Sequence, residues 1–456
     1  MDVLAQAPQP TITCYHSVKN NQAVKEPYQS FTPTSSDISG KNLQSYNFDN
    51  SIDNFGGSFS FTVKEDITRT KTFMDQVQPL DVIVICESGS EQEIDFIGVV
   101  TTISIGGMAS NLNKSVTVSG KSIEWLFLFY NINTDLKSCV FQNSAANKTF
   151  KTDLAKRDGT AGISIKDIVT ASFDMFKERA DKNPEISNTI IGDLIDLWYK
   201  KDYFDSSNEV FLYPISSNLF DSGKITVIDF IKKVLPSPLY EIYGYINKNG
   251  EPKIKVRKVP YDNANATKTI IPNVLTDFTL TRTCDEVYTA FMPYVEGSSK
   301  DPSFYMNLQA AKGQSDNQEL KGYNSAKMND KKVKLYGYQL LTCSFVGYRE
   351  NTKNNEETLD NDKLISLADQ MEKYFGNLDE MYNGDFTIVN YTKQRWPIIG
   401  EWVRFADGMF YIHSASHSWN YGDNPMINYN VSRGGKYVDG VFQKLENLSA
   451  VYKEFD

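Results

Sequence analysis

Two histidines four residues apart, His413 and His417, are the first residues in this sequence that could perform chemistry. On a helix, this spacing would place both imidazoles on one face, as in zinc-binding helices. The surrounding segment 410–419 instead alternates apolar and small polar residues, which is typical of a strand. Four residues of a strand span roughly 13 Å, which is too far for one metal ion to bridge. We therefore expect core or interface histidines and predict no metal site.

Motifs for nucleotide binding and nucleophilic catalysis are incomplete. Gly120-Lys121-Ser122 matches the end of a phosphate-binding loop, but Ser115 stands where that loop needs glycine. The sequence has no GxSxG elbow and no dinucleotide fingerprint. A catalytic triad would have to use His16, His413 or His417, since these are the 3 histidines of the chain. We predict no catalytic residue, no cofactor and no enzymatic activity.

Carboxylate pairs for glycoside hydrolysis stay open as an alternative, because 57 acidic residues supply many spatial pairs. The 26 tyrosines and 5 tryptophans are also compatible with sugar binding. A polysaccharide-binding or polysaccharide-degrading β-rich protein is therefore the second interpretation. It requires exposed aromatic side chains that line a groove, whereas a structural protein requires them in its core.

Composition limits the remaining classes. The net charge of −10 argues against nucleic-acid binding, which needs a basic surface. No apolar run approaches the roughly 20 residues of a membrane helix, and the N-terminus lacks the pattern of a secretory signal. We expect a chain without a membrane anchor that folds in a cytoplasm. The cysteines are scattered and are predicted to be reduced, mostly buried thiols: Cys14, Cys86, Cys139, Cys284 and Cys343.

One pattern of strands occurs twice, about three hundred residues apart. Each copy has a proline-led turn, a short apolar strand, a hairpin into an alternating strand, and a last strand that ends at glycine. The first copy covers 79–120 and the second covers 397–434. We predict two similar β-barrel modules and assign their hairpin geometry and interior packing to seven structural positions: Pro79, Gly98, Gly120, Pro397, Gly400, Trp419 and Gly434.

Several other elements have clear signals. Thr226 to Asp229 reads as a capping box that opens a helix, and Pro236 stops it. Asn249-Gly250 predicts a hairpin turn. An apolar stripe from Leu364 to Tyr374 predicts a helix ended by Gly376. Further helices are expected over 121–130, 165–176 and 190–200.

The fold class that follows is α+β and β-rich, with two barrel-like domains related by an internal repeat. A helical segment separates them, and there are insertions. The predicted parts are an N-terminal arm (1–45), the first barrel (46–130), a mainly helical connection (131–236), a β-hairpin region of the second barrel (237–296), an insertion with a polar loop at 297–332 and one helix (297–380), the closing part of the second barrel (381–436) and a C-terminal helix or tail (437–456).

The closing segment resembles that of phage tail hub proteins. The likeness rests on Pro397-Ile398-Ile399-Gly400, on His417-Ser418-Trp419 and on Ser432 to Gly435. The run Phe96 to Val100 and the stretch Val118 to Leu126 resemble the N-terminal module of the same family. Its middle is similar to Leu235–Tyr243 and to the hairpin that ends at Arg257–Asp262. The motifs occur in the family's order from about residue 45 to 436.

This resemblance implies a baseplate hub of a contractile tail, in a phage, an R-type bacteriocin or a related injection system. The family includes the N-terminal part of type VI secretion spikes. Its two tube domains per chain trimerise into a pseudo-sixfold ring, which joins the sixfold tail tube to the threefold central spike. The implied partners are two further copies of the chain, the tail tube protein, the central spike protein and the baseplate wedge proteins.

Overall fold

The structure is a computed structural model. Of the 456 residues it describes 10–19, 22–23, 27–32, 42–66, 72–88, 93–107, 113–128, 163–164, 169, 204–206, 210–211, 226–235, 237–295, 327–345, 350–351, 357–358, 361–390 and 395–445. The helices predicted over 165–176 and 190–200 lie outside these residues, apart from Val169. Among the described helices, none has the length and apolar composition needed to cross a membrane.

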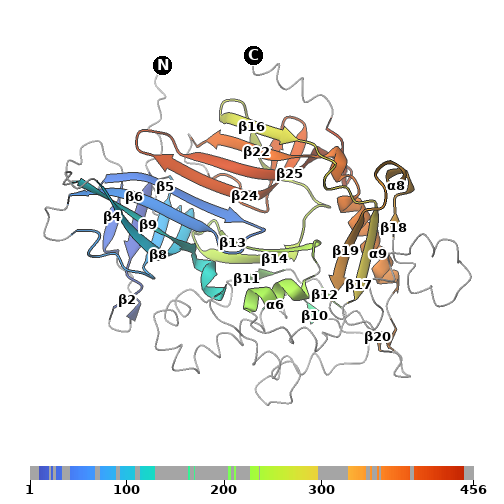
Figure 1. Cartoon of the computed structure of the whole chain (residues 1–456), viewed down its shortest axis with the longest axis horizontal. Helices are drawn as coiled ribbons and strands as arrows, with labels where there is room; N and C mark the ends of the chain where they lie inside the picture. Colours follow the sequence, from blue (N-terminus) through green and yellow to red (C-terminus); the bar gives the residue numbers. More distant parts are fainter. Residues whose placement is uncertain are drawn as a thin grey trace, which may run out of the picture.

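One fourteen-stranded sheet dominates the molecule and curls around its interior (Figure 1). Its strands are β1 (Thr11–Tyr15), β4 (Gln29–Phe31), β5 (Asn42–Ser51), β6 (Ser58–Asp66), β7 (Val82–Cys86), β8 (Phe96–Gly106), β9 (Asn113–Ser122), β15 (Ala266–Ile270), β16 (Leu275–Thr281), β22 (Tyr382–Val389), β23 (Trp402–Phe405), β24 (Gly408–Asn420), β25 (Met426–Val438) and β26 (Val441–Gln443). The main order is β16-β22-β25-β24-β5-β6-β9-β8-β7-β1-β4. In addition, β23 pairs with β24 and β15, and β26 pairs with β25.

The internal repeat is confirmed by this order. The strands β5-β6-β9-β8-β7 form the first module, and β16-β22-β25-β24-β23 form the second module. When the five strands of each module are counted in chain order, the pairings are the same. The first strand pairs with the second, the second with the fifth, the fifth with the fourth, and the fourth with the third. Two five-stranded units with the same connections therefore lie edge to edge in one sheet, and the predicted β-rich class holds.

Irregularities of the backbone recur at matching places in the two modules. A β-bulge interrupts β8 after Val100, and another interrupts β24 after Ile412. A second pair of bulges follows Leu43 in β5 and Leu275 in β16. Since a bulge fixes the register of its strand, these four positions align the modules residue by residue.

The turn that leads into each hairpin also repeats. Leu80 and Gly400 both have a positive φ, of 71° and 77°. The N–H of Leu80 donates to the Val100 carbonyl, and the N–H of Gly400 donates to the Ile412 carbonyl. This match makes Ile399 the counterpart of Pro79. Val431 is likewise the counterpart of Gly120, because the two residues lie opposite Ile412 and Val100. The sequence alignment of Pro79 with Pro397, and of Gly120 with Gly434, is therefore displaced by two and three residues.

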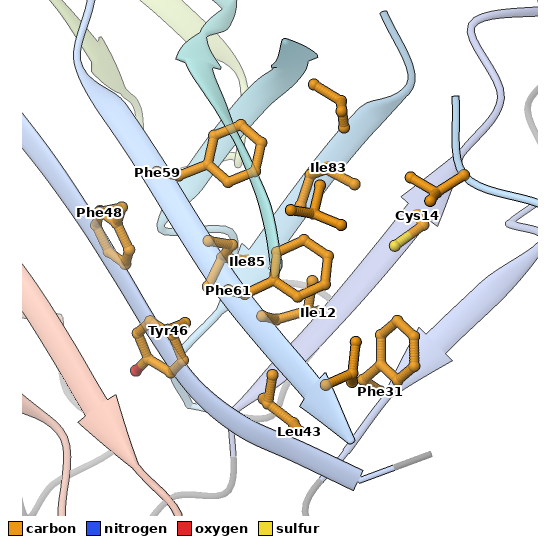
Figure 2. Close-up of a cluster of buried hydrophobic side chains, with 14 of the residues drawn as sticks. Ile12, Cys14, Phe31, Leu43, Tyr46, Phe48, Phe59, Phe61, Ile83 and Ile85 are labelled. Atoms are coloured by element: carbon orange, nitrogen blue, oxygen red, sulfur yellow. The ribbon is translucent and has the colours of Figure 1, made fainter. Parts of the chain in front are cut away.

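The core of the first module takes in strands of the N-terminal segment, which the sequence analysis assigned to an arm over 1–45. Strand β1 lies between β7 and β4, and Ile12 and Cys14 are fully buried. Figure 2 shows side chains from β1, β4, β5, β6 and β7 pointing into one interior. Strand β1 was harder to predict because Thr11 and Thr13 are also buried, beside hydroxyls of β4 and its flank.

Local signals predicted the connecting elements well. Helix α6 (Val227–Val234) begins at the capping box of Thr226 and Asp229. Strands β13 (Tyr240–Ile246) and β14 (Pro252–Lys258) form the hairpin around Asn249-Gly250, and α9 (Asn361–Phe375) ends before Gly376. The helix expected from residue 121 is the 3-10 helix η1 (Ile123–Leu128). The remaining elements are β2 (Val18–Lys19), β3 (Gln22–Ala23), β10 (Ile163–Ser164), β11 (Phe204–Ser206), β12 (Val210–Phe211), β17 (Ala290–Val295), β18 (Lys327–Met328), α8 (Asp330–Tyr336), β19 (Leu340–Phe345), β20 (Glu350–Asn351), β21 (Glu357–Thr358) and η5 (Leu378–Glu380).

Two expectations need correction. The polar insertion predicted as a loop to residue 332 ends in β18 and α8, so the insertion contains a second helix. Asn329 caps α8 by accepting a hydrogen bond from the N–H of Lys332. The tail from residue 437 begins as strand: β25 continues to Val438 and turns into β26 through Asp439-Gly440. Both turn residues have positive φ, of 49° and 79°, which is the Asp-Gly hairpin chemistry that the sequence analysis overlooked.

Candidate functional site at the seam between the modules

The two modules meet at one antiparallel ladder, which we call the seam. Its seven residue pairs run from Ser414 opposite Ser51 to Asn420 opposite Ser45, and they join β24 of the second module to β5 of the first. The N–H of Ile52 adds a hydrogen bond of 3.0 Å to the carbonyl of His413. The seam converts two separate sheets into one continuous sheet, so it sets how the repeated units sit next to each other.

Aromatic rings pack across the seam. The imidazole of His417 stacks on the ring of Phe48 at a centroid distance of 4.3 Å. Trp419 stacks on Tyr46 at 5.9 Å. Trp419 lies in the core of the first module, although its strand belongs to the second. Its side chain therefore ties the modules together and does not fill the interior of its own barrel.

A partly buried polar cluster includes two of these ring residues, His417 and Tyr46. Glu87 follows β7, and its side chain is 4% exposed. One carboxylate oxygen of Glu87 accepts a hydrogen bond from Tyr46 Oη at 2.9 Å, and the other accepts one from His417 Nδ1 at 3.0 Å. The N–H of Glu87 donates to Asp95 Oδ2 at 2.7 Å. Residues from both modules thus complete each other's hydrogen bonds, as buried polar groups require.

Burial and charge shift the acid–base properties of this cluster. Burial, and next the negative charge of Glu87, raise the pKa of Asp95 to about 7. Burial alone would lower the pKa of His417, but Glu87 and Asp95 outweigh it, and the pKa of His417 is raised. Arg395 faces the same groups and acts in the opposite direction on both pKa values. Asp95 and His417 therefore bind protons more strongly in the folded chain than in the unfolded chain.

A cavity of about 290 Å³ opens beside the cluster. Phe48, Glu87, Asp95, Tyr245, Arg395 and Trp396 contribute to its walls. The guanidinium of Arg395 donates to the carbonyl of Asn247 at 2.6 Å, which links the cavity wall to the β13–β14 hairpin. The cavity is thus lined by both modules and by the connection between them.

The two histidines do not form a site together. His413 lies at the bulge of β24 and packs edge-on against Tyr411 at 5.4 Å. Burial lowers the pKa of His413, opposite to the change at His417. Within the described residues, no three His, Cys, Asp or Glu side chains are arranged to hold a metal ion. The chemistry available at the seam is proton binding and packing.

The predicted structural glycines lie at close contacts. A Cβ at Gly98 would approach the ring of Phe59 to 2.6 Å, and one at Gly434 would approach the ring of Phe410 to 2.1 Å. At Gly120 the nearest atom would be the Val99 carbonyl oxygen, at 2.0 Å. The remaining predicted positions differ in kind: Pro79 precedes the positive-φ residue Leu80, and the carbonyl of Pro397 accepts a hydrogen bond from Tyr429 Oη at 2.8 Å.

Gly400→Ala is expected to destabilise the chain by about 2–3 kcal/mol. The residue has φ +77°, and a Cβ would lie 2.2 Å from Tyr243 Oη. It would also displace Arg257, whose guanidinium donates to the Gly400 carbonyl at 2.5 Å and to Glu241 at 2.7 Å. Chemical denaturation measures the effect. Gly422→Ala is the matched control, because φ is +95° there but no atom lies within 4 Å. Equal losses in both variants would contradict the role given to Tyr243 and Arg257.

The sequence analysis missed Glu87, Asp95 and Tyr46. Glu87 and His417 are separated by 330 residues, so no local spacing connects them. The one available signal was the position of Glu87 directly after the continuous apolar run Val82–Cys86. A carboxylate there is close to a core and needs a partner.

Comparisons with known proteins agree on the fold. No protein-family model and no curated protein matches the sequence. Among solved structures, the 43 kDa tail protein of prophage MuSo2 from Shewanella oneidensis is similar, with 9% identity and a TM-score of 0.51 over 93% of this chain and 98% of that one. The tail protein from Neisseria meningitidis MC58 is similar as well, with 9% identity and a TM-score of 0.50 over 95% and 98%. The chain therefore shares the fold of these two tail proteins over more than nine-tenths of its length.

Proposed function

We propose that this chain is a structural hub in the baseplate of a contractile tail or related injection particle. The observation that supports it best is the seam, which joins two copies of one module edge to edge in a single sheet. Three chains with two modules each present six similar units. A homotrimer of this kind can join a sixfold tail tube to a threefold central spike. Baseplate wedge proteins would contact its outer side.

A non-enzymatic role fits the interior of the molecule. The buried polar groups at the seam are bonded to one another, and both oxygens of Glu87 are occupied. The alternative of a polysaccharide-binding or polysaccharide-degrading protein needs exposed aromatic side chains. Among the described residues, Tyr421 is the one large aromatic with high exposure, at 50%. One such ring does not line a groove, so the structural role has more support.

The mass of the assembled protein tests this proposal. We expect the purified chain, mixed with its spike partner, to form a complex with three copies of the chain. Imaging of that complex should show a ring with six similar lobes and threefold symmetry. Light scattering across a concentration series, with and without the spike protein, separates weak self-association from none. A chain that stays monomeric with the spike protein present would contradict the proposal.

A further inference from the structure

The β13–β14 hairpin has one polar face and one apolar face, because the side chains of a strand alternate between the two sides of a sheet. The polar face carries Glu241, Tyr243 and Arg257. The apolar face carries residues that are all buried: Ile242, Gly244, Ile246, Ile254 and Val256. Each face packs against a different module, so two separate contacts hold the hairpin.

Polar and charged groups fix the polar face to the second module. Tyr411 of β24 donates from its Oη to Glu241 Oε2 at 2.6 Å, and the guanidinium of Arg257 donates to the Gly400 carbonyl at 2.5 Å. Arg257 also donates to Glu241 Oε1 at 2.7 Å. Burial raises the pKa of Glu241, and the positive charge of Arg257 opposes that change. A rise in pH therefore leaves this ion pair in place.

Apolar burial joins the other face to the first module. Ile246 shares a core with buried residues of β7, β8 and η1, namely Val82, Val84, Cys86, Ile97, Val99, Ile123 and Leu126. The turn of the hairpin meets the same module, since a Cβ at Gly250 would lie 3.4 Å from the Cβ of Ile94. The hairpin thus covers a core of the first module while its polar face is bound to the second.

One carboxyl lies within this apolar contact. Glu124 of η1 is 6% exposed, and a Cβ at Gly244 would lie 2.2 Å from Glu124 Oε1. The carboxyl therefore lies directly against the main chain of β13, at a position where only glycine leaves room for it. An ionised carboxyl in such a place needs a cation or several hydrogen bonds to balance the cost of its burial.

The described cations near η1 are engaged elsewhere. Those of β14 pair with other carboxylates, Lys253 with Glu251, Lys255 with Asp205, Arg257 with Glu241 and Lys258 with Asp262. On α6, Asp229 and Lys232 are exposed. Strand β8 carries no charged side chain, and Glu124 is the one charged residue of η1. The charge of Glu124 is thus not balanced within the part of the chain that the structure describes.

We propose that Glu124 makes the contact between the hairpin and the first module a proton-dependent latch. With a proton on Glu124, the apolar face of the hairpin packs against η1 and the core of the first module. Without that proton, the hairpin separates from the first module more often, while its polar face stays bound to the second. Both contacts lie within one chain, so this inference does not depend on the proposed role as a hub.

The pH range of the latch follows from the sign of one pKa shift. Burial raises the pKa of Glu124 to about 7 in the closed latch, above the ordinary value of 4.5 that applies once the carboxyl reaches water. The closed latch therefore binds the proton more strongly. Its extra stability is complete below pH 4.5 and is lost as the pH rises to 7. The equilibrium constant for opening is expected to rise at least about tenfold between pH 5 and pH 8.

Cys86 is a native probe of the latch, because its thiol is buried in the core that the hairpin covers. The rate at which a thiol reagent labels Cys86 in the folded chain, divided by the rate in the denatured chain at the same pH, measures how often this core opens. This ratio is expected to be at least about tenfold higher at pH 8 than at pH 5. Cys14, which is buried in a separate core, should stay protected at both pH values.

Three substitutions assign the pH dependence. Glu124→Gln removes the titrating group while keeping its shape, and should leave Cys86 equally protected at pH 5 and pH 8. Glu93→Gln is the matched control, because Glu93 is an exposed carboxyl of the same module, and it should keep the rise. Asp95→Asn should keep the rise too, since Asp95 lies at the seam. The proposal is overturned by a rise that persists in Glu124→Gln or disappears in Asp95→Asn, and by equal exposure of Cys14 and Cys86.

A disulfide across the contact gives a second measurement. The Cβ atoms at positions 94 and 250 would lie 3.4 Å apart, close to the separation found in disulfides. In its oxidised form, Ile94→Cys with Gly250→Cys is expected to fix the hairpin to the first module and to protect Cys86 at pH 8. The same protein after reduction is the control and should regain the rise. Equal labelling of Cys86 in both forms would show that the hairpin does not cover this core, and the proposal would fail.

Discussion

Asp95→Asn is expected to raise the midpoint of thermal unfolding by several degrees at pH 8 and by much less at pH 5. The folded chain keeps a proton on Asp95 up to a pKa of about 7, whereas the unfolded chain releases it near the usual value of 3.8. Stability from this proton is complete below the unfolded pKa and is lost as the pH rises through 7. The amide has no proton to lose, and its oxygen can still accept the N–H of Glu87.

The size of the effect follows from the difference between the two pKa values. Each unit corresponds to about 1.4 kcal/mol. The charges of Glu87 and His417 act on Asp95, so the shift of its pKa does not convert fully into stability. Through Asp95, the chain is expected to lose about 2 kcal/mol of unfolding free energy between pH 5 and pH 8. The raised pKa of His417 acts in the same direction, because its charge stabilises the folded chain and is lost at high pH. The unchanged chain should therefore also lose stability over this range.

Thermal unfolding of Asp95→Asn and Asp407→Asn at both pH values is the measurement. Asp407 is an exposed carboxyl in the turn between β23 and β24. Its replacement should change the midpoint little at either pH. An Asp95→Asn variant that gains equally at pH 5 and pH 8, or that loses stability at pH 8, would show that Asp95 is ionised in the folded chain.

Gly120→Ala is expected to cost about 3 kcal/mol or more of unfolding free energy, or to prevent folding. A Cβ there would lie 2.0 Å from the Val99 carbonyl oxygen and 2.7 Å from the ring of Phe59. Strand β9 pairs with β6 on one side and β8 on the other, so the main chain cannot shift to make room. This clash involves the backbone, which no change of rotamer relieves.

Gly106→Ala is the control for this prediction. Gly106 lies in the adjacent strand, and the nearest atom to an added Cβ would be Ser115 Oγ at 3.0 Å. The serine side chain can rotate away, so denaturant unfolding should show a small change. If Gly120→Ala is as stable as Gly106→Ala, the close packing of β9 against β8 is wrong.

Local sequence patterns predicted an element correctly where its start, turn or end depends on a few adjacent residues. The capping box at Thr226 opens α6, Asn249-Gly250 turns the β13–β14 hairpin, and Gly376 follows the end of α9. These elements are decided by a few neighbouring residues and by the geometry of one turn. Strand β1 was harder to predict, because Thr11 and Thr13 alternate with Ile12 and Cys14 as exposed polar residues would, yet both threonines are buried.

The repeat was visible in the sequence, but its register was not. A pattern of period two looks the same after a shift of two residues. The sequence therefore aligned Pro79 with Pro397, two residues before its structural counterpart Ile399. The true register depends on the bulges after Val100 and Ile412, and these are properties of paired strands. The sequence of a single strand does not indicate where a bulge will form when it pairs with another strand.

Composition and strand periodicity by themselves determined that this chain is β-rich, that its strand pattern repeats, and that His413 and His417 lie on a strand, where four residues separate them too far to share one zinc ion. Only the tertiary structure decided which edges meet. It brought Glu87 to His417 across 330 residues, and among the described residues it left one side of β16 and one side of β8 beyond Val100 without a paired strand. The reason is physical: main-chain hydrogen bonds are alike for every residue, so strand order follows from which faces and side chains fit once the sheets have formed.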